Sequence, residues 1–259
     1  MRSKPPLEGE VALVTGASGD IGGATARRLA ELGARVGVHY HATEAGARRV
    51  LEAIESAGGT GMLLQADVGK EADVGRMARE IESRLGAVTL LVNNAGSGAE
   101  HNQVEEMTLE EWNSVVGSHL TGAFLCTRAF VPGMRKRGHG RIVNISSICG
   151  LSGDCSPGYC SAKAGLLGLT RSCAARLAPR IQVNAVLPGF VGLKHHRGAQ
   201  KRVETVAPDG RIADPEEVAE LVTMLLSLKT GFLTGACIPI DGGASTASLG
   251  MHMDWIRQE

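Results

Sequence analysis

The sequence predicts an α/β fold in which one parallel β-sheet is covered by helices on both faces. Apolar runs of four to six residues alternate along the chain with longer amphipathic stretches. Continuously apolar strands indicate burial on both faces, and a helix between successive strands indicates parallel crossovers. Because such crossovers are right-handed, we expect a doubly wound parallel sheet.

The alternation divides the chain into seven strands and six helices. The expected strands are Val11–Thr15, Arg35–His39, Gly61–Ala66, Thr89–Asn93, Arg141–Ile145, Gln182–Leu187 and Ala236–Ile240. The expected helices are Ile21–Leu32, Glu44–Ala57, Glu71–Leu85, Leu109–Arg137, Gly158–Ala178 and Pro215–Leu228. No linker or repeat interrupts the pattern, so residues 1–259 are interpreted as a single domain. The least patterned segment, at about 193–210, is interpreted as a substrate flap.

Composition excludes several classes of function. Lys+Arg and Asp+Glu both number 27, so the neutral chain has no electrostatic attraction to nucleic acid or to an anionic membrane. Its apolar stretches are too short to cross a bilayer. No apolar signal region follows the basic N-terminus, which favours a cytoplasmic location.

The cysteines predict neither disulfides nor a metal site. Six of them occur without a Cys-x-x-Cys pair or zinc-type spacing. We therefore expect buried or half-buried thiols in a reducing compartment. The adjacent pair His195-His196 lacks helical spacing, so no metal site is expected.

A glycine-rich turn follows the first strand and opens the first helix. It reads Thr15-Gly16-Ala17-Ser18-Gly19-Asp20-Ile21-Gly22. Small residues allow the backbone to approach a pyrophosphate at the positive end of a helix. The turn predicts Rossmann-type dinucleotide binding, although such a turn also occurs without a ligand.

Tyr159 and Lys163 predict acid–base chemistry on a later helix. Residues four apart share a helix face, so the ammonium is expected beside the phenol. A nearby cation favours phenolate and lowers the pKa of a tyrosine. The phenol can then act as a general acid toward a carbonyl, or as a base toward an alcohol.

With these motifs together, the chain resembles the short-chain dehydrogenase/reductase family from Gly9 to about Ser245. Within that family it is similar to reductases of 3-oxoacyl (β-ketoacyl) thioesters. The motifs that carry the resemblance are the glycine-rich turn, Ala66-Asp67-Val68, Asn93-Asn94-Ala95-Gly96, Ile145-Ser146-Ser147, Tyr159-x-x-x-Lys163, Pro188-Gly189 and Ile240-Asp241-Gly242-Gly243.

The resemblance implies an NAD(P)-dependent oxidoreductase that interconverts a ketone and a secondary alcohol. Tyr159 is implied as the proton donor, Lys163 as its modulator and ribose ligand, and Ser147 as the donor to the substrate oxygen. His119 is a fourth candidate for a catalytic role. The implied cofactor-binding residues are Gly16, Ser18, Asp20, Ile21, Tyr40, His41, Asp67, Val68, Asn94, Ala95, Gly96, Tyr159, Lys163, Pro188, Gly189 and Val191.

Several residues depart from the family pattern. Asp20 replaces a glycine of the turn, and Leu193 replaces a threonine that follows Pro-Gly. His119 stands where the family has an Asn that braces a water leading to the lysine. The histidine either relays protons near pH 7 in its neutral form or only preserves polarity without a new role. Ser147 lies one position nearer to Tyr159 than is usual, so Ser146 remains the alternative catalytic serine.

The residues at the end of the second strand indicate whether the chain prefers NADP(H) or NAD(H). His39-Tyr40-His41-Ala42-Thr43 contains no acid that would hold an adenosine ribose diol. NADP(H) is therefore favoured over NAD(H), although neither Gly19 nor Ala42 is the arginine that typically binds the 2′-phosphate.

The expected substrate is a small-molecule ketone or alcohol, either free or linked to a carrier protein or CoA that Arg135-Lys136-Arg137 and Arg180 help to dock. The alternatives are a non-redox elimination, cyclisation or isomerisation on the same fold, or a non-catalytic nucleotide-binding regulator. The resemblance also implies a homotetramer that pairs the helices 109–137 and 158–178, where Phe124 and Ala164 stand among apolar and small residues.

Overall fold

The computed structural model describes residues 4–246 apart from 99–100, 102, 193–202 and 205. Seven parallel strands form one sheet in the order β3-β2-β1-β4-β5-β6-β7, which confirms the predicted doubly wound architecture. The strands are β1 (Val11–Val14), β2 (Arg35–Tyr40), β3 (Thr60–Gln65), β4 (Leu90–Asn93), β5 (Gly140–Ile145), β6 (Ile181–Pro188) and β7 (Cys237–Ile240).

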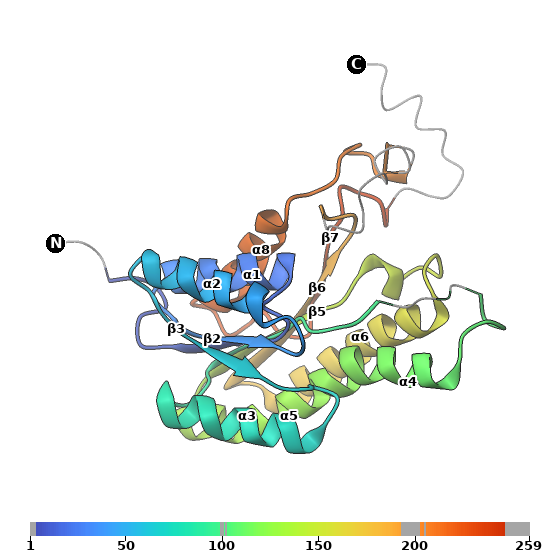
Figure 1. The fold of residues 1–259 in the computed structure, drawn as a ribbon. Helices are drawn as coiled ribbons and strands as arrows, with labels where there is room; N and C mark the ends of the chain where they lie inside the picture. The colour runs from blue at the N-terminus through green and yellow to red at the C-terminus, as the bar shows by residue number, and fades with distance from the viewer. Residues whose placement is uncertain (1–3, 99–100, 102, 193–202, 205, 247–259) are drawn as a thin grey trace.

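Helices cover both faces of the sheet (Figure 1). One layer holds α1 (Asp20–Glu31), α2 (Glu44–Ser56) and α8 (Pro215–Ser227). The other holds α3 (Glu71–Arg84), α4 (Leu109–Val116), α5 (Gly122–Arg137) and α6 (Pro157–Leu177). None of the helices in the described part of the chain combines the length and the apolarity that a membrane span requires.

A large apolar core lies on each face of the sheet, as buried parallel strands require. Val36 and Val38 of β2 pack with Leu29 of α1 and Val222 of α8. On the other face Leu13 and Leu91 pack with Met77, Ile81 and Phe130 of α3 and α5. Alternate residues of each strand therefore face different helix layers.

The predicted helix Leu109–Arg137 is interrupted in the structure. A π-helical turn, Gly117–Thr121, separates α4 from α5. One extra residue in such a turn rotates the side chains that follow it, and π-turns are frequent at functional sites. His119 lies within this turn and is directed inward, with only 7% of its surface exposed.

The strand order places the candidate site. It reverses between β1 and β4, and ligands of open α/β sheets bind outside the carboxyl ends of the strands at such a reversal. The glycine-rich turn follows β1 there, and Asn94, Ala95 and Gly96 follow β4. Ser147 follows β5 at the same edge.

Candidate active site

The glycine-rich turn is closely packed against α1. Gly16 has φ +66°, a conformation that favours glycine. A Cβ on Gly22 would lie 2.4 Å from the Gly16 carbonyl oxygen, so only glycine lets the helix approach this near. Gly19 caps α1 without a side-chain hydrogen bond. The first amides of the helix remain available for an anion, which fits a dinucleotide pyrophosphate.

The remaining predicted cofactor residues of the turn are Ser18, Asp20 and Ile21, and Asp20 adds a negative charge beside the expected pyrophosphate. Asp20 opens α1, where a carboxylate interacts favourably with the helix dipole but adds charge beside the expected phosphates. Ser18, Asp20 and Ile21 are partly exposed, which leaves this side of the turn accessible.

Asn94 joins the turn to β4. Its Nδ2 donates to the carbonyl oxygens of Thr15 at 2.9 Å and of Gly16 at 3.2 Å. The Thr15 hydroxyl oxygen accepts in return from the amides of Asn94 and Ala95. These bonds hold the strand ends on either side of the reversal together.

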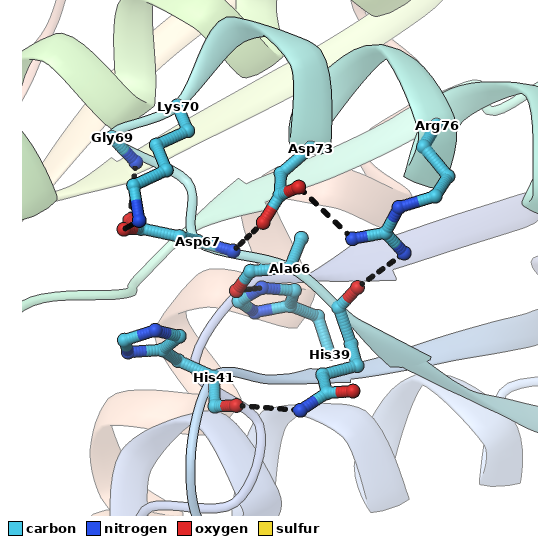
Figure 2. Close-up of polar contacts among 9 residues, drawn as sticks. His39, His41, Ala66, Asp67, Gly69, Lys70, Asp73 and Arg76 are labelled. Carbon is cyan, nitrogen blue, oxygen red and sulfur yellow. Dashed lines mark hydrogen bonds and ion pairs between the residues drawn. The ribbon is translucent and has the colours of Figure 1, made fainter.

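His39 is a positioning residue that the sequence did not single out. Its Nδ1 accepts from the amide of Gly16 at 2.9 Å, and its Nε2 lies 3.1 Å from the carbonyl oxygen of Ala66. The two partners fix a neutral ring with the proton on Nε2. Burial lowers the pKa of His39 to about 4. The imidazole therefore ties the glycine-rich turn to the residue that follows β3, and Figure 2 shows its contact with Ala66.

The neighbours of His39 differ in where their side chains lie. Tyr40 packs into the core with Val38, and the pKa of its phenol is raised by burial and then by Glu44. His41 is exposed at the end of β2. Of these two predicted cofactor residues, only His41 presents its ring on the surface.

Asp67 is rigidly held after β3. Its Oδ1 accepts from the amide of Gly69 at 3.0 Å, and Oδ2 lies 3.2 Å from Lys70 Nζ. Its own amide donates to Asp73, which pairs with Arg76 (Figure 2). Val68 is buried. The carboxylate thus stands in a fixed position at the edge where the adenine is expected.

Tyr159 and Lys163 share the inner face of α6, which begins at the cap residue Ser156. The Lys163 Nζ lies 5.4 Å from the centre of the Tyr159 ring and donates to the Ile145 carbonyl oxygen at 2.8 Å. Burial lowers the pKa of Lys163 to about 7. The predicted proximity is therefore present.

The expected lowering of the tyrosine pKa is not found. The pKa of Tyr159 is raised because burial outweighs a hydrogen bond from Ser147, which favours phenolate. Burial also lowers the pKa of Lys163, which disfavours the ammonium that was expected to stabilise the phenolate.

The two candidate serines have different partners. The Ser146 hydroxyl donates to the carbonyl oxygen of Lys163 at 2.8 Å and is 2% exposed. Ser147 hydrogen-bonds the phenol of Tyr159 and accepts at Oγ from the amide of Cys149 at 3.1 Å. Only Ser147 presents its hydroxyl to the phenol.

His119 is buried against Tyr159. The two rings meet edge to face at 5.2 Å. The Nε2 of His119 lies 2.8 Å from the Ser97 carbonyl oxygen, and Nδ1 is buried with no partner among the described residues. A Cβ on Gly96 would lie 1.8 Å from the His119 ring, so this glycine makes room for the imidazole.

The charge state of His119 follows from its surroundings. Burial, and then the positive charge of Lys163, lower the pKa of His119 to about 3. The ring is therefore neutral near pH 7, so its charge does not change in that range. A neutral imidazole with Nδ1 as an acceptor remains.

Pro188 ends β6, and the chain then turns past β7. Gly189 lies so near Asp241 that a Cβ would be 2.7 Å from the aspartate Cβ. Val191 is buried and bridges to Ala213. Leu193 and most of the predicted flap lie outside the described residues.

Two expectations need correction. Cys149 and Cys155 form a disulfide, which the expected set of six free thiols did not include. The two cysteines come together because of how the loop between them folds, and their spacing in the sequence does not reveal this. Arg135–Arg137 end α5, and Arg180 precedes β6, so they lie at the amino ends of the parallel strands, opposite Ser147, and do not line the site.

Comparison with known proteins identifies the family. The family described as enoyl-(acyl carrier protein) reductase matches residues 16–245. The chain belongs to the short-chain dehydrogenase/reductase family. A 3-oxoacyl-[acyl-carrier-protein] reductase of Synechocystis is 38% identical, covering 92% of this chain and 97% of the relative. An acetoacetyl-CoA reductase of Rhizobium meliloti is 41% identical, covering 90% and 97%.

The fold is similar to a solved structure, that of a double mutant of a Serratia marcescens short-chain dehydrogenase/reductase. Its TM-score is 0.88 at 33% identity, with 93% of this chain and 99% of that chain covered. Family membership and the assembled site make the protein an NAD(P)-dependent oxidoreductase that interconverts a ketone and a secondary alcohol.

Proposed function

We propose that this enzyme reduces a β-keto thioester, with NADP(H) favoured over NAD(H). The relatives named above act on 3-oxoacyl-carrier-protein and acetoacetyl-CoA by their names, which supports a carrier- or CoA-linked ketone. The observation that carries the catalytic assignment is the convergence of Ser147, Tyr159 and Lys163 at the carboxyl end of β5.

The nicotinamide cofactor supplies the hydride when it is bound. Ser147 donates to the substrate oxygen and stabilises the negative charge that develops there. Tyr159 then delivers its proton to the same oxygen as general acid. Lys163 holds positive charge beneath the phenol and favours its ionised form after transfer. In alcohol oxidation the same phenolate accepts the proton.

His119 acts in this scheme as a neutral acceptor. Its Nδ1 accepts a hydrogen bond from a water molecule that leads toward Lys163, the role that the family gives to an Asn. The buried Nδ1, which has no partner among the described residues, and the ring contact with Tyr159 support this role.

The cofactor assignments extend along the carboxyl ends of the strands. The pyrophosphate is assigned to the turn at Gly16–Ile21, and the adenosine end to Asp67, Val68 and the strand end at Tyr40–His41. Asn94–Gly96 bound the groove. The nicotinamide end is assigned to Pro188, Gly189 and Val191, with Tyr159 and Lys163 at the ribose.

The remaining assignments concern the whole chain. We infer one NAD(P)-binding domain over residues 1–259, with a substrate flap at about 193–210. We also infer a homotetramer, supported by the 44% exposure of Phe124 on α5 and the exposed Ala164 on α6. A cytoplasmic location stays a prediction.

Replacement of Tyr159 by Phe tests the mechanism. It keeps the ring but removes the transferable proton, so kcat with acetoacetyl-CoA and NADPH should fall about 10²–10⁴-fold, while NADPH still binds. The two serines provide a matched pair. Ser147→Ala should lower kcat about 10²-fold, whereas Ser146→Ala should act on stability and leave most of kcat.

Nucleotide absorbance measures turnover, and a fluorescence titration measures NADPH binding. A Tyr159→Phe variant that turns over at the wild-type rate would rule out the proposed mechanism. A larger loss for Ser146→Ala than for Ser147→Ala would reverse the serine assignment.

A further inference from the structure

A covalent link closes the segment between Ser147 and Tyr159. Cys149 and Cys155 form a disulfide across six positions, with 6.0 Å between their Cα atoms. Cys149 stands two residues after Ser147, and Cys155 stands four before Tyr159. The disulfide therefore spans most of the chain that connects the two side chains assigned to the substrate oxygen.

The first half of this link acts directly on Ser147. The backbone amide of Cys149 donates to Ser147 Oγ at 3.1 Å, so the position of Cys149 orients the serine hydroxyl. The short 3₁₀ turn Ile148–Gly150 packs against α6. A Cβ on Gly150 would lie 2.8 Å from the carbonyl carbon of Lys163, which shows how closely the turn approaches that helix.

The second half adjoins the start of α6. Cys155 immediately precedes Ser156, which is buried and caps the helix by accepting at Oγ from the amide of Tyr159 at 3.4 Å. The disulfide thus connects the residue that orients Ser147 to the cap of the helix that carries Tyr159.

The residues between Gly150 and Cys155 are exposed. Leu151 is 55% exposed, and a Cβ on Gly153 would meet nothing within 4 Å. The Ser152 hydroxyl donates to Asp154 inside the loop itself, at 2.5 Å. Cys155 is partly exposed, so a reducing dithiol can reach the sulfur pair.

We propose that Cys149 and Cys155 form a reversible thiol–disulfide modification site that controls the placement of Ser147 relative to Tyr159. This inference rests on the proposed catalytic roles of those two residues. A dithiol attacks one sulfur to form a mixed disulfide, and its second thiol then displaces the protein. Two electrons and two protons pass to the cysteines, which become thiols, and the dithiol is oxidised to its intramolecular disulfide. Reversible disulfides of cytosolic proteins are typically catalytic or redox-sensing.

Reduction should lower kcat more than nucleotide affinity. The link bears on Ser147, whereas the glycine-rich turn is held separately by His39 and Asn94. We expect kcat to fall about tenfold, less than the 10²-fold loss that a misplacement of about 1 Å can cause. The dissociation constant for NADPH should stay within about twofold.

The full-length enzyme is equilibrated in buffers of reduced and oxidised dithiothreitol over a range of ratios. Thiol alkylation followed by peptide mass mapping gives the fraction of the Cys149–Cys155 disulfide. Turnover with acetoacetyl-CoA and NADPH is measured on the same samples. The fall in kcat should follow the loss of the disulfide with one midpoint.

Cysteine variants separate this pair from other thiols. The double variant Cys149→Ser/Cys155→Ser should have low kcat that does not respond to the buffer. Cys173→Ser, which removes a free thiol on the distal part of α6, should respond like the wild type. Circular dichroism shows whether the double variant is folded. If it is not, the titration of wild-type kcat against the fraction of disulfide tests the inference by itself.

Three results would overturn the inference: no Cys149–Cys155 disulfide at the most oxidising ratio, a kcat that changes less than twofold across complete reduction, or a double variant that still responds. Failure of the proposed function looks different. In that case ketone-dependent NADPH oxidation is absent at every ratio, while mass mapping still reports the state of the disulfide.

Discussion

Two buried histidines should make the enzyme sensitive to mild acid. The pKa of His39 is lowered to about 4 and that of His119 to about 3, against about 6.5 in an unfolded chain. Between these values the unfolded state binds more protons than the folded state. The free energy of unfolding therefore falls as the pH drops below about 6.5, and the loss stops only below the folded pKa values.

The size of the effect follows from the shifts. An unfolded histidine is mostly neutral at pH 7 and almost fully protonated at pH 5, whereas the two folded histidines stay mainly neutral over this interval. Each histidine should then lower the free energy of unfolding by about 2 kcal/mol over this interval, and the pair by about 4 kcal/mol. Lys163, with a pKa lowered to about 7, acts mainly above pH 7. The interval thus isolates the histidines.

Urea unfolding at fixed protein concentration, measured at pH 7 and pH 5, provides the test. His119→Asn and His39→Asn should each reduce the pH-dependent difference by about 2 kcal/mol, whatever they do to stability at pH 7. His41→Asn, which removes an exposed histidine two residues from His39, is the control and should reduce the difference by much less than about 2 kcal/mol. Equal pH differences in the wild type and both buried variants would refute the argument.

Two further predictions concern the cofactor and the assembly. NADPH should bind about tenfold more tightly than NADH, or about 1.4 kcal/mol, because no carboxylate stands at Tyr40–His41 to repel a 2′-phosphate; tighter binding of NADH in a fluorescence titration would overturn this preference. Light scattering at micromolar concentration should give the mass of a tetramer, and Phe124→Glu should reduce that mass by placing a charge on the exposed helix face; a wild-type monomer would contradict the assembly.

The sequence predicted the sheet well because its strands are buried on both faces. An apolar run such as Ile181–Pro188, which is buried throughout, is hard to mistake for a surface element. The prediction of one continuous helix over Leu109–Arg137 was wrong at the π-turn that contains His119. The periodicity of apolar residues does not reveal the single extra residue of such a turn.

Part of the site was also predictable, because the carboxyl ends of parallel strands meet at one edge. Tyr159, Lys163 and Ser147 come together as the motifs implied. The sequence favoured Ser147 over Ser146 as the catalytic serine, but only coordinates show that the Ser146 hydroxyl turns toward the Lys163 carbonyl.

His39 and the disulfide escaped prediction for different reasons. A histidine inside the apolar strand Arg35–Tyr40 is a visible anomaly, and it could have indicated a buried hydrogen-bonding role. Its partners, Gly16 and Ala66, follow β1 and β3, which only the sheet order brings to either side of His39. The approach of Cys149 to Cys155 depends on a loop without a periodic pattern.

Burial is the common cause of the pKa directions in the site. It lowers the pKa of His39, His119 and Lys163 and raises that of Tyr159, and each shift disfavours the charged form. The hydrogen bond from Ser147 opposes this trend at the phenol. A permanent cation at position 119 would add positive charge beside Lys163 and further disfavour its ammonium. A neutral imidazole keeps polarity next to Tyr159 without that competing charge, so it is compatible with a mechanism in which Lys163 supplies the positive charge beneath the phenol.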